Sequence, residues 1–163
     1  MQRQRRQAGG GGLMIWGMVM PNGLVTIKKI EGKMNSDKYV GLLSKFIVPI
    51  MNLNMRPNYN YIQDNAPIHV SMLSKTFLNN QSFRTLTWPA KSPDLNLMEN
   101  VWKIISDIVY ENKQACHWQE LEEKINQAVL YINNNKINSV KTLYSSFRQR
   151  LTKVLISHGK LLN

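Results

Sequence analysis

The first ordered pattern along the chain is strand-like. Residues 13–20 and 24–30 are rich in β-forming side chains, and Pro21-Asn22-Gly23 joins the two segments. Asn and Gly tolerate the positive φ angles that tight hairpin turns require. The pattern therefore predicts an antiparallel hairpin.

Apolar residues then recur at three- and four-residue steps, as on one face of a helix that Asn35 would cap. This face consists of Val40, Leu43, Phe46, Ile47 and Ile50. Further along, residues 59–63 read as a strand, residues 70–78 as a short helix, and residues 83–88 as a strand ended by Pro89. Because strand and helix alternate here, we expect the two strands to pair in parallel.

The sequence after Pro93 is helical, and we expect three helices there. The apolar face of the first is Val101, Trp102, Ile105, Ile108 and Val109. The second uses Trp118, Leu121, Ile125, Val129 and Ile132. The third uses Val140, Leu143, Tyr144, Phe147, Leu151, Val154 and Leu155. The other face of the third helix is basic and is either solvated or aligned with phosphates. It carries Lys141, Arg148, Arg150 and Lys153.

Composition narrows the class of protein. With 163 residues, of which 43% are hydrophobic, the chain is long enough for one domain with a core. Its 21 Lys and Arg against 10 Asp and Glu give a net charge of +11, which favours a polyanionic partner, with nucleic acid ahead of an anionic membrane.

Two classes of protein are disfavoured. The longest apolar run, residues 13–20, is far shorter than the roughly 20 residues that span a bilayer, so we expect no membrane span and no secretory signal. The single cysteine, Cys116, excludes an internal disulfide and a multi-cysteine zinc site. This usage fits a reducing compartment, the nucleus or the cytosol.

Asp64 directly follows the strand predicted at residues 59–63. Its carboxylate should therefore project from the carboxyl end of that strand, where ligands gather in open α/β sheets. The alternative is that Asp64 only caps the helix that follows Pro67.

Glu99 is the second candidate acid. It lies three residues after Asn96, the spacing of a capping box in which the acid bonds back to the N-cap amide. Capping and metal binding would both place this carboxylate in the first helical turn. Position alone therefore does not separate the two roles.

Asp64 and Glu99 indicate a function more clearly as a pair than singly, because their spacing and the motifs around them can be compared together. The 34 residues 65–98 lie between the two acids. Three motifs surround them in order: Gln-Asp-Asn-Ala-Pro-x-His, Trp-Pro-Ala-x-Ser-Pro-Asp-Leu-Asn and Glu-Asn-x-Trp. This arrangement resembles the Tc/mariner superfamily of cut-and-paste DNA transposases. Residues 9–17 resemble the glycine-rich strand of that family, and residues 146–159 resemble its C-terminal helix and tail.

The resemblance implies an α/β, ribonuclease H-like fold in which two aspartates and a glutamate hold two Mg²⁺ ions, with Mn²⁺ as a substitute. By position, Asp64 would be the second acid and Glu99 the third. Asn65 would orient the acid or contact DNA, and His69 would support the site unless it is simply a histidine at a helix start. Asp94 is better explained as a turn residue than as a metal ligand.

The chain departs from the family pattern in two places. Leu97 stands where the family has proline, a substitution that the first helical position tolerates. The first catalytic aspartate of the family lies on a strand before the glycine-rich segment, and the only acids before Asp64 are Glu31 and Asp37. Neither is in the right place, so we expect an incomplete two-metal site and no catalysis by this chain alone.

The expected organisation follows the resemblance. Residues 1–12 would be a basic, glycine-rich, disordered start, residues 13–115 a partial ribonuclease H-like DDE catalytic domain, and residues 116–163 the C-terminal helices of the same domain. The first strand of its mixed sheet would be missing, between the hairpin and the parallel pair. The helix-turn-helix region with which such transposases recognise their terminal repeats would be missing as well.

The expected function is Mg²⁺-dependent DNA cleavage and strand transfer in the ancestral protein. Its partners would be transposon ends and target DNA in the nucleus, and a second copy or an intact transposase. Two alternatives remain open: an inactive remnant that binds nucleic acid, and a protein-interaction module formed by the helices from Trp118 onward.

Overall fold

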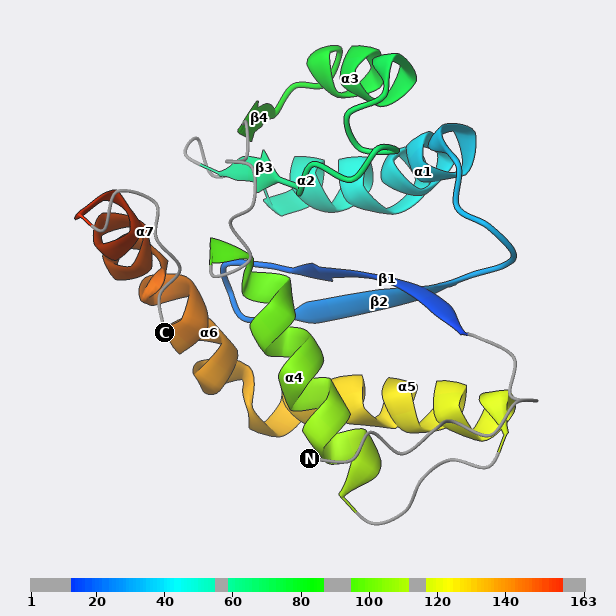
Figure 1. Cartoon of the computed structure of the whole chain (residues 1–163), viewed down its shortest axis with the longest axis vertical. Helices are drawn as coiled ribbons and strands as arrows, with labels where there is room; N and C mark the ends of the chain where they lie inside the picture. Colours follow the sequence, from blue (N-terminus) through cyan, green and yellow to red (C-terminus); the bar gives the residue numbers. More distant parts are fainter. Residues whose placement is uncertain (1–12, 55–58, 87–94, 112–116, 157–163) are drawn as a thin grey trace. The chain divides into compact units, whose positions relative to one another are not determined.

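The computed structural model describes residues 13–54, 59–86, 95–111 and 117–156 (Figure 1). The chain divides into two compact units. The hairpin unit contains residues 1–30 and 93–163, and the middle unit contains residues 31–92. The disordered start predicted at residues 1–12 lies outside the described residues, and the boundary predicted at residue 115 stays a prediction.

The predicted hairpin is confirmed. Strand β1 (Met14–Val19) pairs antiparallel with β2 (Val25–Ile30). Gly23 closes the turn by donating its N–H to the Met20 carbonyl over 2.8 Å, and its φ of +86° is one that glycine adopts without strain.

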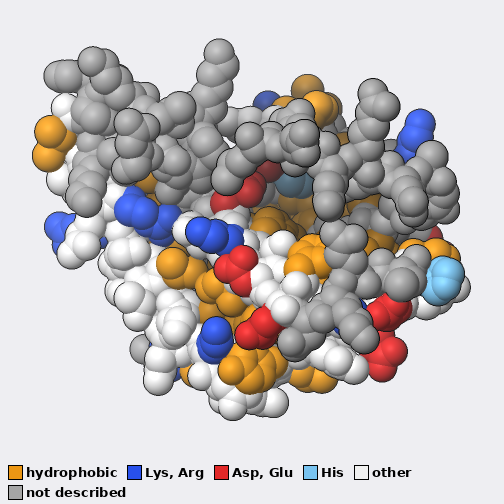
Figure 2. Space-filling model, turned by 60° about the horizontal axis from the view of Figure 1, so that its bottom comes forward, with side chains coloured by type: hydrophobic (Ala, Val, Ile, Leu, Met, Phe, Trp, Pro, Cys, Tyr) orange, Lys and Arg blue, Asp and Glu red, His pale blue; other side chains and the backbone are white. Residues whose placement is uncertain are grey.

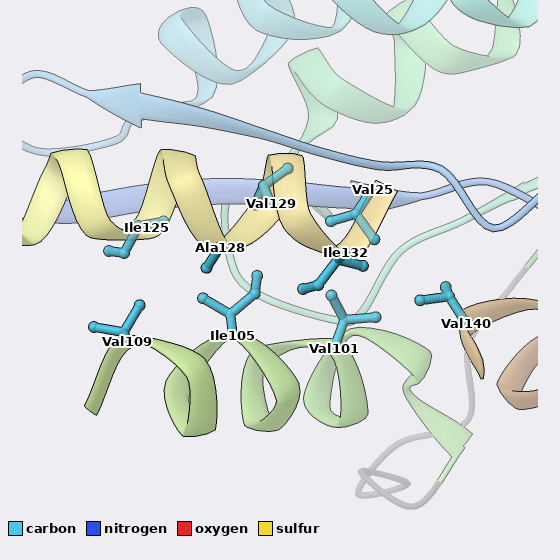
Figure 3. Close-up of a cluster of buried hydrophobic side chains, with 9 residues drawn as sticks. All are labelled: Val25, Val101, Ile105, Val109, Ile125, Ala128, Val129, Ile132 and Val140. Atoms are coloured by element: carbon cyan, nitrogen blue, oxygen red, sulfur yellow. The ribbon is translucent and has the colours of Figure 1, made fainter. Parts of the chain in front are cut away.

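Two of the predicted helices are also confirmed, and they form the core of the hairpin unit. Helix α4 (Leu97–Tyr110) packs against β1, and α5 (Trp118–Asn135) packs against β2 and α4. Figure 3 shows the buried side chains of α4 and α5 pointing toward one another. The cluster consists of Val25, Val101, Ile105, Val109, Ile125, Ala128, Val129, Ile132 and Val140.

Trp118 does not join this cluster, although the sequence pattern placed it on the apolar face. It is the first residue of α5 and is 42% exposed. The Lys29 ammonium lies 4.4 Å from the centre of its ring, and that ammonium also forms a 2.7 Å ion pair with Glu122. A cation–π contact at the surface therefore replaces the burial that we expected.

An asparagine satisfies the polar backbone groups at the beginning of β2. The Asn133 amide accepts a hydrogen bond from the Val25 N–H and donates one to the Val25 carbonyl, both over 2.9 Å. Val25 is only 2% exposed, so water has little access to these two groups. Asn133 thus connects α5 to β2 through two hydrogen bonds.

The prediction of one continuous third helix is wrong. The structure has α6 (Ile137–Ser145) and α7 (Phe147–Ile156), separated at Ser146. The Leu143 carbonyl, near the end of α6, accepts hydrogen bonds from the Ser146 hydroxyl over 2.9 Å and from Arg150 over 3.0 Å. Side-chain donors that compete for a helical carbonyl interrupt or bend a helix, which accounts for the break.

The middle unit begins with the helical run predicted from Asn35, whose side chain accepts the Lys38 N–H over 2.9 Å. The run is α1 (Ser36–Leu42), a π-helical segment η1 (Leu43–Ile47) and α2 (Val48–Asn54). The π-helical segment is a single wide turn within an otherwise α-helical run. Of the predicted face, Leu43 and Ile47 are buried, whereas Val40, Phe46 and Ile50 are only partly buried. Tyr39 and Leu42 complete the buried set.

The predicted parallel pairing is confirmed in the middle unit. Strand β3 (Asn60–Ile62) runs parallel to β4 (Arg84–Leu86), with Tyr61 opposite Thr85. Between them, α3 (Met72–Asn79) packs against α1 and β4. Ser71 is the N-cap of α3, because its hydroxyl accepts the Ser74 N–H over 3.3 Å.

The described strands form two separate two-stranded sheets, one antiparallel and one parallel. We expected one mixed sheet whose first strand is missing between the hairpin and the parallel pair. The hairpin β1–β2 and the parallel pair β3–β4 are both present. The helices of the described ranges are all too short or too polar to cross a membrane.

Candidate metal centre

Asp64 lies just beyond the carboxyl end of β3, where the sequence placed it. Its Oδ1 atom accepts the Ala66 N–H over 3.0 Å and lies 2.6 Å from Nδ1 of His69. The alternative that Asp64 caps the next helix is wrong, since Ser71 caps α3 and Asp64 instead holds the turn before it.

Neither contact of Asp64 with the described residues involves its second oxygen, Oδ2. An ionised carboxylate only accepts hydrogen bonds, so Nδ1 of His69 carries the proton of this contact. Both contacts involve Oδ1, and the Asp64 side chain is 50% exposed, whereas that of His69 is 15% exposed. Metal-binding carboxylates are typically oriented by such hydrogen bonds. Oδ2 is therefore suited to bind a cation.

Two residues that the sequence did not single out support this turn. The Tyr39 hydroxyl bonds to Oε1 of Gln63 and lies 3.1 Å from the Tyr61 hydroxyl. Nε2 of Gln63 donates to the His69 carbonyl over 3.1 Å, and the Tyr39 and His69 ring centres are 4.4 Å apart. An apolar-looking tyrosine in a helical pattern gives no sequence signal of this role.

The buried phenols keep their protons. Burial raises the pKa of Tyr39 far above its ordinary value, and the neighbouring Tyr61 raises it further. Burial likewise raises the pKa of Tyr61, to about 12. Both hydroxyls therefore remain hydrogen-bond donors at neutral pH.

A cavity of about 230 Å³ lies beside Asp64 in the middle unit. Its lining is mixed polar and apolar, and Lys75 is its cationic member. The hydroxyl of Thr85, another lining residue, is buried without a hydrogen-bond partner. The described residues that line it are Gln63, Asp64, Asn65, His69, Val70, Lys75, Leu78, Asn79, Thr85 and Leu86.

Glu99 lies in the first turn of α4 in the hairpin unit, and its side chain is exposed. Asn96 caps this helix by accepting the Met98 N–H over 3.0 Å. Within the described ranges, the Asn96 side chain bonds to the Met98 N–H and not to the Glu99 N–H, and the Glu99 carboxylate accepts no hydrogen bond from the Asn96 N–H. The helix therefore has an N-cap but not the capping box that the spacing suggested. The helix dipole favours a carboxylate in this first turn. The Glu99 carboxylate oxygens form no hydrogen bond or ion pair with another described residue.

The remaining predicted residues lie in different surroundings. Asn65 lines the cavity beside Asp64, whereas Asp94 and the side chain of Lys153 lie outside the described residues. Arg148 is exposed on α7. Arg150 turns back to donate to the Leu143 carbonyl, and burial lowers its pKa. A DNA contact by Arg148 or Arg150 stays a prediction.

Carboxylate oxygens suit a hard cation such as Mg²⁺ or Mn²⁺, and Asp64 and Glu99 both offer them. Over the described parts of the chain, no three His, Cys, Asp or Glu side chains gather closely enough to hold a metal ion. Figure 2 shows one face of the molecule, on which Lys and Arg side chains are mixed with Asp and Glu around exposed hydrophobic surface.

Comparison with known proteins shows the family of the chain. Residues 2–122 match the family described as DDE superfamily endonuclease. The chain is 34% identical over 160 residues to the transposable element Tc3 transposase of Caenorhabditis elegans, which covers 98% of this chain. It is 26% identical over 151 residues to the Tcb1 transposase of Caenorhabditis briggsae, which covers 93% of it. The chain spans about half the length of these relatives, 48% and 54% respectively.

Solved structures show the same fold. The catalytic domain of Mos1 mariner transposase matches with a TM-score of 0.74 and 15% identity, over 93% of this chain and 76% of that one. The Mos1 mariner paired end complex with Mn matches with a TM-score of 0.77 and 16% identity, over all of this chain and 48% of that one. The fold is thus the ribonuclease H-like fold of mariner catalytic domains, and the chain belongs to the DDE endonuclease superfamily as a Tc/mariner transposase domain.

Proposed function

We propose that the ancestral activity of this domain is cleavage and joining of DNA strands in transposition, with Asp64 and Glu99 as two of the carboxylates that hold Mg²⁺, or Mn²⁺ in its place. The observation that carries the proposal is the geometry of Asp64. Its Oδ1 is fixed by Ala66 and His69, while its half-exposed carboxylate lies at a strand end beside the cavity.

Bound at such carboxylates, two divalent ions would activate an attacking oxygen and stabilise the oxygen that leaves phosphorus. The residues of this chain would bind and orient the reactants. Asp64 and Glu99 would hold the ions, and Lys75, which forms no ion pair with another described residue, would bind a DNA phosphate at the cavity. The Mos1 paired end complex is itself a DDE relative with Mn, which supports a divalent ion and transposon DNA as ligands.

We further propose that the 163 residues alone do not catalyse cleavage. In support, no three His, Cys, Asp or Glu side chains gather closely enough among the described residues to hold a metal ion. The test is incubation of the chain with supercoiled DNA and Mg²⁺ or Mn²⁺. We expect no nicking above the level of the Asp64→Ala and Glu99→Ala variants, and nicking that disappears in both variants would overturn the proposal.

A non-catalytic role in binding DNA is the second candidate, favoured by the net charge of +11. In that case, DNA binding would weaken steeply with salt and would be insensitive to Asp64→Ala. In either role, we expect the chain to lie in the nucleus and to bind transposon DNA. It would do so as a monomer, as a homodimer or together with an intact transposase. Binding that is independent of salt would argue against both.

A further inference from the structure

The turn that carries Asp64 is held by a hydrogen-bonded chain whose proton directions are fixed by chemistry. A backbone carbonyl only accepts, so the Gln63 atom that contacts the His69 carbonyl is the amide nitrogen. The other Gln63 atom, Oε1, is then the acceptor for the Tyr39 hydroxyl proton. Tyr39, having given its proton to Gln63, accepts the proton of Tyr61.

Tyr39 reaches His69 by two routes. Through Gln63 it anchors the backbone carbonyl of His69, and through its ring it packs against the imidazole, with ring centres 4.4 Å apart. The His69 N–H is also held, since it donates to the Ala66 carbonyl over 2.8 Å. His69 is therefore held at its ring, its backbone N–H and its backbone carbonyl, with Nδ1 directed at Asp64.

This rigidity comes from a distant element. Tyr39 belongs to α1, is fully buried, and lies 24 residues before Gln63 in the sequence. Helix α1 also packs against α3, which follows the Asp64 turn. The position of the Asp64 carboxylate is thus coupled to the middle of the unit and not only to its own turn.

We propose that Tyr39 and Gln63 are positioning residues for the metal ligand Asp64, acting through His69. The inference rests on the proposed function, because it assigns a role in orienting the same carboxylate. Residues that orient metal ligands typically affect metal affinity by about 10- to 100-fold when they are changed. A purely structural role for Tyr39 and Gln63 would change stability without changing the geometry of Asp64.

Stability and metal affinity can be separated with three variants. Tyr39→Phe keeps the ring beside His69 but leaves the Tyr61 hydroxyl without its acceptor and Gln63 Oε1 without its donor. Gln63→Leu removes the anchor of the His69 carbonyl. The double variant removes both partners of the Tyr39–Gln63 bond, and paired removal to apolar groups costs less stability than leaving one partner orphaned. Stability should therefore partly recover in the double variant, whereas metal affinity should stay low.

The experiment is nuclear magnetic resonance of the full chain, recorded near 10 °C, where marginal domains are close to their maximum stability. Nitrogen shifts of the imidazole report the tautomer of His69, and Mn²⁺ broadening of the Ala66 amide signal reports the affinity at Asp64. Tyr110→Phe and Gln119→Leu change the same residue types at exposed positions of the hairpin unit and serve as controls.

We expect the wild type and both controls to hold His69 in the tautomer protonated at Nδ1. In Tyr39→Phe, Gln63→Leu and the double variant, the tautomers should mix, and about tenfold more Mn²⁺ should be needed for the same broadening. Wild-type tautomer and Mn²⁺ response in all three variants would overturn the inference. The Asp64→Asn variant tests the proposed function separately: an unchanged Mn²⁺ response in that variant would contradict the metal role of Asp64. A mixture of His69 tautomers in Tyr39→Phe would still support the contact by which Tyr39 positions His69.

Discussion

Gly17 on β1 lets the beginning of α4, and with it Glu99, approach the hairpin. A Cβ atom at Gly17 would lie 2.7 Å from Cε of Met98 and 2.7 Å from Cζ2 and Cη2 of Trp102. Glu99 lies between these two residues on the same helix. The flexible Met98 end can move aside, but the Trp102 ring is part of the packed interface, so Gly17→Ala should displace the first turns of α4.

The expected magnitude follows from two opposing terms. Overpacking of a well-packed interface costs about 1–3 kcal/mol. Replacing glycine in a strand with alanine returns about 0.5–1 kcal/mol, because the unfolded chain has less freedom to lose. The net effect of Gly17→Ala is a loss of about 1 kcal/mol in the free energy of unfolding, within a span of about 0 to 2.5 kcal/mol.

Gly41 in α1 is the matched control, since a Cβ there would meet no atom within 4 Å. Gly41→Ala in an exposed helical position should stabilise by about 1 kcal/mol. Urea titrations of both variants should place their midpoints on opposite sides of the wild type, separated on the order of 1 M. A Gly17→Ala protein at least as stable as wild type would refute the close packing of β1 against α4.

Two further predictions concern buried polar groups. Asn133→Leu removes the side-chain partners of the Val25 N–H and carbonyl, so it should lower the free energy of unfolding by about 2–3 kcal/mol, measured by heat or urea. The control is Asn134→Leu at the exposed neighbouring position, which should change that free energy by less than about 0.5 kcal/mol. Equal effects of the two substitutions would contradict the assigned hydrogen bonds. Because burial raises the pKa values of Tyr39 and Tyr61 above 10.0, the unfolded chain loses these protons first, so their contribution to stability is complete below about pH 10 and declines as the pH rises towards 12. Urea midpoints measured from pH 8 to 11.5 should show a shallower decline for Tyr39→Phe than for wild type, and an unchanged slope would contradict the burial of this phenol.

Local patterns in the sequence predicted most of the elements. The turn at Asn22 and Gly23, the caps at Asn35 and Asn96, and the apolar face of α4 each follow from interactions within a few residues, and each is present. The family motifs around Asp64 and Glu99 correctly indicated the superfamily, because those motifs combine several residues in a fixed order.

Features that depend on distant contacts were not predictable. Tyr39 lies in α1, before the π-helical segment, and no local pattern indicates that Tyr39 is buried more deeply than its neighbour Val40. The break at Ser146 depends on Arg150 reaching back to Leu143. The support of Asp64 by Tyr39 joins residues far apart in the chain, so sequence spacing alone could not reveal it.

The central claim is that Asp64 and Glu99 bind the divalent ions of a DNA-cleaving domain. The most direct test is a Mn²⁺ titration of the full chain by electron paramagnetic resonance, in which bound Mn²⁺ no longer contributes to the six-line signal of the free ion. We predict that Asp64→Asn and Glu99→Gln each weaken Mn²⁺ binding about tenfold or more, whereas the same change at the exposed acid Asp37 has no effect. Binding that is identical in wild type, Asp64→Asn and Glu99→Gln would contradict the claim.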